Sequence, residues 1–420
     1  MRKYPKYKPS DIEWIGDIPE HWEVEKLRYI GNFTSSGIDK KINKDEPLVK
    51  IINYTDIYGN STRLLTSERN YMEVSCPEEK RVEHKVKKGD LVFTPSSETT
   101  EDIGLSALVD EDLENTAYSY HVLRFRFDKE VDHSFKKYLC NNYFILNQFS
   151  ANAKGTTRKI LNRENFNSAL VIIPPKPEQA AIANLLDEKT AQIDKLITNK
   201  QKLIELLKQE RTGIINRAVT RGINPNVKLK PSGIEWLGDI PEHWEIKKLK
   251  YILRVKSGDG IKSEEIDFEG TYPVYGGNGI MGYTENYNSD RLDIIIGRVG
   301  AKCGNVRLVN GKKWISDNAL VADLFEGYVY KLISILLESI NLNSLANQNA
   351  QPLITGTLVR DKIVAIPSNI KEQDEIVQYI EIEAKRIDGT ISKIEKEIEL
   401  LQEYRTALIS EVVTGKIKVM

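Results

Sequence analysis

The sequence predicts an α+β protein built as a tandem repeat, in which two globular domains are joined by two long antiparallel helices that form a coiled coil. Three observations support this prediction. A segment near the N-terminus returns in the middle of the chain. Two stretches of about forty residues carry apolar residues at helical spacing. The remaining segments alternate short strand-like runs with helix-like runs, which is typical of α+β domains.

Length and composition limit the classes of protein to consider. At 420 residues, with 40% hydrophobic and 29% charged side chains, the chain is long enough for two ordinary domains. We find no apolar run that could cross a bilayer and no basic-then-apolar leader, so we expect a soluble, cytoplasmic protein with no membrane partner. The net charge of -1 excludes coating of nucleic acid through bulk positive charge, but it permits a local basic surface.

The cysteines give no sign of a disulfide framework or a metal site. Cys76, Cys140 and Cys303 are far apart, form no CxxC pair and have no histidine at metal-ligand spacing. We therefore expect them to be buried apolar residues, and we predict no metal site.

The duplication is visible as two gapless matches. KPSDIEWIGDIPEHWEVEKLRYI at residues 8–30 returns as KPSGIEWLGDIPEHWEIKKLKYI at residues 230–252, with 18 of 23 positions identical at an offset of 222. From Glu178 a second match, to the segment beginning at Glu372, has an offset of 194. The difference of 28 means that the interior of the first copy is longer than that of the second. The flanking segments of the two copies are therefore alike, and the interior segments between them differ.

The interiors share an order of predicted elements. Each has two strand-like runs, a helix-like stretch and a last strand that ends at an Ile-Pro step. In the first copy these are Leu91 to Thr94, His121 to Phe127, Phe135 to Phe149, and Leu170 to Ile173 before Pro174. In the second copy they are Ile294 to Ile296, Ala319 to Phe325, Val329 to Leu345, and Ile363 to Ile366 before Pro367.

Each copy then enters a long helix. Apolar residues recur from Glu178 to about Ala218, including Ile193, Leu196, Ile197 and Leu203, and again from Glu372 to about Val413. Each helix would be roughly 60 Å long, longer than one domain could bury. Lys200 and other polar residues on the stripe favour a partly solvated coiled coil over a buried core.

These signals divide the chain into five parts. We predict a first domain at 1–177, which contains the leading repeat 8–30, a first helix at 178–221 and a linker at 222–233. A second domain follows at 234–371, led by the repeat at 230–252, and the second helix occupies 372–420. Two linked copies with different interiors suit the reading of two different DNA half-sequences at a fixed separation. A duplicated scaffold that binds no nucleic acid is the alternative at this stage.

The chain resembles the specificity subunit of type I restriction-modification systems over essentially its whole length. The resemblance rests on the two leading repeats, on YPVYGGNGIMGY at residues 272–283 with IIIGRVGAKCG at 294–304, and on the Ile-Pro step followed by Glu-Gln and a long helix. The first domain departs from the pattern because it lacks the YGGNG and GRVG motifs. Its assignment depends on its flanks and on weaker matches such as KKGDLVFTPSS at 87–97.

The resemblance implies a fold and a function. It implies two target-recognition domains that each read one half of an asymmetric bipartite site in double-stranded DNA, and helices that set the spacer. It further implies partners: two modification (methyltransferase) subunits docked on the helices, and restriction (translocase and nuclease) subunits. S-adenosylmethionine, ATP and Mg²⁺ would belong to those partners, and the chain itself would have no cofactor and no catalytic residue.

Candidate DNA-binding residues come from four segments. The segment from Ile294 to Ser316 has five basic residues and no acidic one, which suits phosphates and guanine edges. A solvated loop or an ordinary strand is the alternative in each case. The candidates in the second domain are Tyr275, Asn278, Arg298, Lys302, Arg307, Lys312 and Lys313. Those in the first domain are Lys50, Asn53, Tyr54, Lys154, Thr156, Thr157, Arg158 and Lys159.

Other motifs have simpler interpretations. The GxGxxG match from Gly277 to Gly282 lacks a following apolar helix, so we interpret it as a tight turn that holds Tyr275 and Asn278 rather than as a nucleotide site. The repeated tryptophans of the leading repeats, with His21 and His243 beside them, suit packing of each repeat on a domain or helix end. The residues of these repeats are Trp14, Trp22, Trp236 and Trp244.

The sequence contains no convincing enzyme motif. The Asn/Asp-Pro-Pro-aromatic loop of adenine methyltransferases and the GxxxxGK[ST] loop of motor ATPases are absent from the sequence. Triplets such as Glu83-His-Lys85 resemble nuclease motifs, but a chain this charged contains them by chance. We therefore expect a non-catalytic DNA-reading subunit. A stand-alone nuclease and a coiled-coil scaffold without DNA remain the competing hypotheses.

Overall fold

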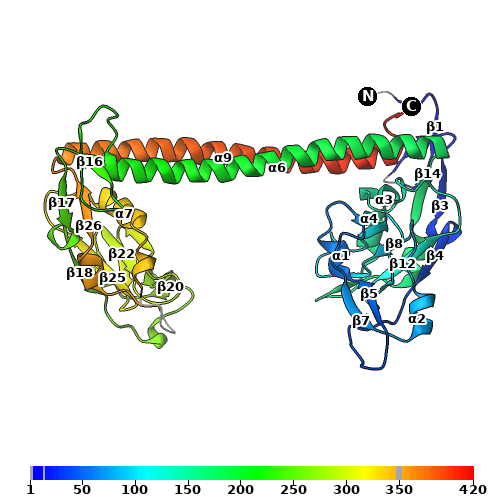
Figure 1. The fold of residues 1–420 in the computed structure, drawn as a ribbon, viewed down its shortest axis with the longest axis horizontal. Helices are drawn as coiled ribbons and strands as arrows, with labels where there is room; N and C mark the ends of the chain where they lie inside the picture. The colour runs from blue at the N-terminus through cyan, green and yellow to red at the C-terminus, as the bar shows by residue number, and fades with distance from the viewer. Residues whose placement is uncertain (1–2, 13–14, 347–351) are drawn as a thin grey trace. The chain divides into compact units, whose positions relative to one another are not determined.

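The computed structural model describes residues 3–12, 15–346 and 352–420. The chain divides into two compact units, the first formed by Met1–Lys200 with Lys396–Met420 and the second by Gln201–Glu395. Each unit combines β-sheets, short helices and part of both long helices (Figure 1). The α+β class and the tandem arrangement are therefore confirmed.

The first unit contains two main sheets. The larger has the order β4-β12-β8-β10-β6 and the smaller has the order β11-β5-β7, with β5 parallel to β11 and antiparallel to β7. The strands of the larger sheet are β4 (Gly31–Thr34), β12 (Leu123–Phe127), β8 (Leu91–Phe93), β10 (Ser106–Val109) and β6 (Leu64–Leu65). Those of the smaller sheet are β11 (Thr116–Tyr118), β5 (Leu48–Ile52) and β7 (Met72–Ser75).

The second unit repeats this frame. One sheet has the order β18-β25-β22-β23, and the other has the order β20-β19-β24-β21, with β19 parallel to β24 and antiparallel to β20. The strands are β18 (Leu253–Ser257), β25 (Ala319–Leu324), β22 (Asp293–Gly297), β23 (Val306–Val309), β20 (Gly279–Thr284), β19 (Tyr272–Gly276), β24 (Lys312–Ile315) and β21 (Ser289–Asp290). The first domain, which lacks the motifs of the second, therefore shares the order of the equivalent strands, β4-β12-β8-β10 and β18-β25-β22-β23, while β6 is added in the first domain and β21 in the second.

The strand that ends at each Ile-Pro step closes its domain against the leading repeat. Strand β14 (Leu170–Ile173) pairs antiparallel with β3 (Glu23–Lys26), and β26 (Ile363–Ile366) pairs in the same way with β17 (Glu245–Lys248). These pairings bring the two ends of each domain together, directly before the helix begins.

One predicted helix is interrupted. The stretch from Phe135 to Phe149 forms α3 (Lys136–Leu139) and α4 (Tyr143–Asn152) with a break between them. Asn142 causes the break because its side chain accepts from the backbone N–H of Ile145 at 3.2 Å and donates to the carbonyls of Tyr138 and Leu139. In the second unit the corresponding stretch forms α7 (Tyr330–Ser339) and a 3₁₀ turn, η4 (Leu342–Leu345).

The two long helices are present and pair antiparallel. Helix α6 spans Lys176–Arg221 and α9 spans Ile370–Val413, each beginning two residues before the predicted start. In the first unit Arg405 Nε donates to Asp194 at 3.0 Å, and Lys200 pairs with Glu397. In the second unit Arg386 pairs with Glu210 at 3.2 Å, and Arg211 pairs with Asp388 at 3.1 Å. Residue numbers that rise along one helix fall along the other, as an antiparallel pair requires.

The buried seam of α6 differs by one position from the predicted stripe. Ile193 and Ile204 are buried and Ile197 is half-buried, whereas Leu196 and Leu203 are each 44% exposed. The prediction for Leu196 and Leu203 is therefore wrong, because the seam alternates steps of four and three residues through Ile193, Ile197, Lys200, Ile204 and Leu207. In α9 the predicted positions are buried or half-buried: Ile387, Ile391, Ile394 and Ile398.

Each helix start is fixed by the leading repeat of its own domain. Glu178 of α6 accepts hydrogen bonds from Tyr4 at 2.7 Å and Trp22 at 3.1 Å, and it pairs with His21. Glu372 of α9 accepts from Trp244 Nε1 at 2.8 Å and pairs with His243. The expectation that His21, Trp22, His243 and Trp244 pack at a helix end is confirmed. Trp236 is instead 48% exposed, and Trp14 lies outside the described residues.

The same tryptophans also contact the end of the other helix. A side chain at Gly415, just after α9, would lie 2.3 Å from Pro19 and 3.1 Å from Trp22, and the glycine has the left-handed φ of a helix C-terminus. A Cβ on Gly222, just after α6, would likewise lie 3.3 Å from the ring of Trp244. Each unit therefore holds the start of one long helix and the end of the other.

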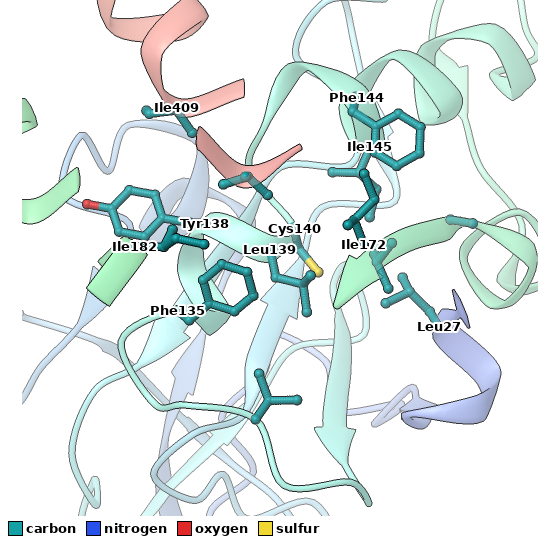
Figure 2. Close-up of a cluster of buried hydrophobic side chains, with 14 of the residues drawn as sticks. Leu27, Phe135, Tyr138, Leu139, Cys140, Phe144, Ile145, Ile172, Ile182 and Ile409 are labelled. Atoms are coloured by element: carbon teal, nitrogen blue, oxygen red, sulfur yellow. The ribbon is translucent and has the colours of Figure 1, made fainter. Parts of the chain in front are cut away.

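This arrangement extends the core of the first domain to both helices. Figure 2 shows Ile182 of α6 and Ile409 of α9 beside Phe135, Tyr138 and Leu139, with Cys140 and Ile172 in the same cluster. These side chains are at most 7% exposed. All three cysteines are buried as expected, and burial raises the pKa of the Cys140 thiol. Over the described parts of the chain, no helix has the length and apolar character needed to cross a membrane.

Candidate nucleic-acid interface

The two motifs of the second domain meet backbone to backbone. A Cβ on Gly277 would lie 2.6 Å from the Val299 carbonyl oxygen, and one on Gly297 would lie 2.1 Å from the Gly277 carbonyl oxygen. Both glycines are required because any side chain would separate the YGGNG turn from the GRVG turn. The GxGxxG match is a β-hairpin turn between β19 and β20, as interpreted from the sequence, and Asn278 is exposed at its tip.

Two arginines flank the Asn278 turn. Arg307 Nη2 donates to the Asn278 carbonyl at 3.2 Å. Arg298 Nη1 donates to Ser257 Oγ at 2.9 Å and to the Asp317 carbonyl at 3.3 Å. Tyr275 is half-buried, and this burial raises the pKa of its hydroxyl, so the group stays a neutral donor. We define the Asn278 cluster as Tyr275, Asn278, Arg298 and Arg307, with Lys302 exposed in the adjoining turn.

The structure removes the last two lysines from this group. Lys313 is 0% exposed, and its Nζ lies 2.8 Å from Asp293 and donates to two backbone carbonyls. The prediction of a basic segment without a counter-charge is wrong here, because Asp293 lies one residue before the segment that we considered. Lys312 is exposed but lies over the rings of Tyr272 and Tyr287, at the end of β24 away from the Asn278 turn.

In the first domain the basic segment forms an exposed hairpin. The backbone groups of Lys154 and Ile160 bond to each other at 3.1 and 2.8 Å, and Lys159 Nζ donates to the Gly155 carbonyl. Lys154, Thr156, Thr157 and Arg158 are exposed at its tip. Strand β13 (Lys159–Ile160) pairs with β9 (Ser96–Ser97), which fixes the hairpin to the domain.

Residues that the sequence did not single out gather beside this hairpin. The rings of Tyr120 and His121 lie 3.8 Å apart, and Lys40 Nζ lies 5.6 Å from the ring of Tyr54. The pKa of His121 is lowered first by burial and then by the positive charges of Lys40 and Arg158. We call this basic and aromatic group the Arg158 cluster: Lys40, Tyr54, Tyr120, His121 and Arg158. Tyr54 and Arg158 were predicted from the sequence, whereas Lys40, Tyr120 and His121 were not, and His121 was placed in the strand-like run that ends at Phe127.

Of the other candidates in the first domain, Asn53 is buried and Lys50 is exposed. Asn53 is 4% exposed and caps helix α1 (Tyr54–Tyr58), and Asp56 completes a capping box with it, so its amide already has protein partners. Asn53 therefore fits the alternative interpretation, in which it is an ordinary polar residue of the fold and not a DNA-binding one. Lys50 is exposed on β5, in register with Glu73 of β7.

Both clusters lie at the same edge of the shared frame. Tyr54 follows β5, and Asn278 follows β19, the equivalent strand. Tyr120 and His121 precede β12, and Asp317 and Asn318 precede the equivalent β25. Two different loop clusters thus occupy one position on a duplicated scaffold.

The two domains share one frame, each has its own surface cluster, and two paired helices follow them. This is the architecture of a protein with two recognition domains in tandem. The family model for the type I restriction modification DNA specificity domain matches residues 19–208 and 241–400, and the chain belongs to this family.

Individual relatives agree with the family match. A putative type I restriction enzyme MjaX specificity subunit of Methanocaldococcus jannaschii is 26% identical over 435 residues, which cover 96% of each chain. The type I restriction enzyme EcoKI specificity subunit of Escherichia coli K12 is 22% identical over 87% of this chain and 82% of the relative. A chain from a solved structure of the type I R-M system shares the fold with a TM-score of 0.74, over 95% of this chain and 99% of that one. The resemblance drawn from the sequence is confirmed.

Proposed function

We propose that this specificity subunit reads an asymmetric bipartite site in double-stranded DNA, with one half read by each domain. The observation that carries the proposal is the pair of unlike clusters on equivalent loops of one frame. The Arg158 cluster offers aromatic faces, a histidine and basic groups, whereas the Asn278 cluster offers an exposed amide between two arginines. Asparagine suits adenine and arginine suits guanine in the major groove. Two different surfaces should specify two different half-sequences.

The proposal assigns the chemistry to partners. The chain would be non-catalytic and hold no cofactor, while modification subunits supply S-adenosylmethionine-dependent methylation and restriction subunits supply ATP-dependent translocation and cleavage. Exposed apolar side chains on the long helices support docking of two modification subunits there. They include Leu196, Leu400 and Tyr404 in the first unit, and Leu203 and Leu206 in the second. A subunit that acts on cellular DNA in this way would work in the cytoplasm.

A domain exchange tests the assignment of half-sites. Residues 251–366 would be replaced by the equivalent segment of a relative with a different target, and the chain would be expressed with its modification subunit. Methylome sequencing should show one new half-site and one unchanged half-site. The matched control replaces residues 29–173, and it should change the other half instead.

Two results would contradict modular reading. A change in both half-sites after one exchange would show that the domains do not act separately. Methylation by the purified chain without a partner would show that the chain is an enzyme.

We further propose that the helices set the spacer between the half-sites. Insertion of seven residues after Lys200 and seven after its partner Glu397 keeps the heptad seam intact. The added length is about 10 Å, which corresponds to roughly 3 base pairs of duplex. The methylated motif should keep both half-sequences and gain about 3 base pairs of spacer. An active complex that still methylates the original spacing would refute a ruler role for the helices.

A further inference from the structure

The second domain contains a polar hollow next to the Asn278 cluster. Its volume is about 200 Å³, and Arg298 is both a wall of the hollow and a member of the cluster. None of the described residues that line it is acidic. The lining residues are Val255, Lys256, Ser257, Arg298, Leu320, Thr355, Gly356, Thr357 and Arg360. Three cationic side chains and three hydroxyl groups therefore surround one small space.

The cations of the hollow differ in how they are held. Arg298 is fixed at its backbone, where its N–H donates to Asn318 and its carbonyl accepts from Ile354 at 2.9 Å. Its Nε is buried and has no hydrogen-bond partner within the described structure. Lys256 and Arg360 are exposed, and neither forms an ion pair with a described residue. A positioned guanidinium with a spare donor and two exposed cations suit an anion with several oxygen acceptors.

The first domain fills the equivalent position. Arg163 is the first residue of α5 (Arg163–Ser168) after its cap Asn162, and its guanidinium donates to the Phe33 carbonyl. Gly356 is the first residue of α8 (Gly356–Arg360) after its cap Thr355. A Cβ on Gly356 would lie 3.2 Å from Val255, which corresponds to Phe33 at the offset of the leading repeats. An arginine thus occupies this place in the first domain, and a glycine leaves it open in the second.

We propose that this hollow binds a phosphate-type oxyanion through Arg298, Arg360 and Lys256. The ligand is a backbone phosphate of the bound duplex, which would place the Asn278 cluster against the bases, or a free phosphate ion of the same chemistry. Contacts of this kind position a protein on DNA without reading sequence. The DNA part of this inference rests on the proposed function, whereas binding of free phosphate does not.

The experiment compares four variants of the full-length chain: Arg360→Ala, Lys256→Ala, Gly356→Arg and the control Lys371→Ala. Lys371 is basic, 84% exposed and outside the hollow. Equal urea midpoints would first confirm that the variants fold. Gly356→Arg copies the first domain and fills the hollow without removing a charge.

Two measurements separate the possible sources of the anion. The first is the salt dependence of binding to a duplex that carries the methylated motif. Loss of one phosphate contact should lower the log-log slope by about 0.9 in Arg360→Ala and leave Lys371→Ala unchanged. The second is the rise in Tm on adding inorganic phosphate at constant ionic strength, which should be present in the wild type and absent in Gly356→Arg.

Each outcome has a defined meaning. Changes in both measurements, or in the salt slope alone, support a hollow that takes a DNA phosphate. A change in the phosphate measurement alone supports a hollow that takes free phosphate. No change in either overturns the proposal, even if domain exchange still alters one half-site and the proposed function stands.

Discussion

The two domains differ clearly at the ends of two equivalent strands, β5 in the first domain and β19 in the second. In the first domain β5 runs into helix α1, and Asn53 caps that helix with a buried amide. In the second domain β19 ends at Gly276 and Gly277, and the chain turns back at once with Asn278 exposed. The pairings of these two strands are the same: β5 is parallel to β11 and antiparallel to β7, and β19 is parallel to β24 and antiparallel to β20. The paired strands therefore fix the position of the loop in each domain. The few residues that follow β5 or β19 determine whether the asparagine is buried in the fold or exposed to a ligand.

A second point of comparison is a buried aspartate at the equivalent strands β8 and β22: Asp90 directly precedes β8, and Asp293 is the first residue of β22. Asp293 pairs with Lys313 at 2.8 Å, and Asp90 pairs with Arg126 at 2.6 Å. Lys313→Ala should lower the free energy of unfolding of the second unit by about 3 kcal/mol, because it breaks a buried ion pair and leaves Asp293 with only the half-exposed Arg291, whose Nε lies 3.1 Å away. Arg126→Ala should cost less, since Arg126 is 32% exposed. Urea denaturation would measure both changes.

The neighbouring lysine provides the control for this comparison. Lys312→Ala removes an equal charge from an exposed position and should leave the urea midpoint unchanged. A loss of stability as large as that of Lys313→Ala would show that burial of the ion pair is not the cause.

The two asparagines should separate stability from recognition. Asn53→Ala removes a helix cap and should cost about 1 kcal/mol of stability. Asn278→Ala should leave the unfolding free energy unchanged and weaken discrimination at one base pair by roughly 1–3 kcal/mol. Calorimetry would measure the first effect, and binding to single-substituted duplexes would measure the second. Equal stability losses would show that Asn278 is also structural.

The smallest predicted effect concerns the helix joints and pH. Burial raises the pKa of Glu178, but hydrogen bonds from Tyr4, His21 and Trp22 together lower it by a larger amount. The net pKa therefore lies below its ordinary value of 4.5. This contribution to stability is fully present above pH 4.5 and is lost as the pH falls through the lower folded value. The urea midpoint of the first unit should therefore fall on acidification, and less so in Glu178→Gln.

Glu372→Gln in the other unit is the matched variant, because Glu372 accepts from the equivalent histidine and tryptophan. An unaltered acid response of the first unit in Glu178→Gln would show that this carboxylate does not govern it.

The sequence predicted the frame well because the signals were redundant. The leading repeats, the Ile-Pro strands and the Glu-Gln helix starts occur twice, and each makes the contact that its composition suggests. The exact seam of α6 was not predictable in the same way, because Leu196 and Leu203 are as apolar as the buried Ile197 and Ile204. Only the position of α9 decides between them.

The candidate site was harder to predict because it is built from loops far apart in sequence. Arg158 and His121 are close through the pairing of β13 with β9 and the start of β12, and no periodicity reports such proximity. Lys313 was misassigned because its partner Asp293 lies on another strand. Arg360 was missed because it is a single arginine in a short helix, and its relation to Arg298 exists only in the folded chain.

The discontinuous first unit has a consequence for synthesis on the ribosome. The second unit is one uninterrupted stretch, from Gln201 to Glu395, and it can complete its core as soon as that stretch has emerged. The first unit also needs Leu408, Ile409, Val412 and Val413, which are made only after the whole of the second unit. The domain that is translated first is therefore completed last. A chain that stops before α9 is finished lacks these side chains, so part of the first core stays exposed to solvent.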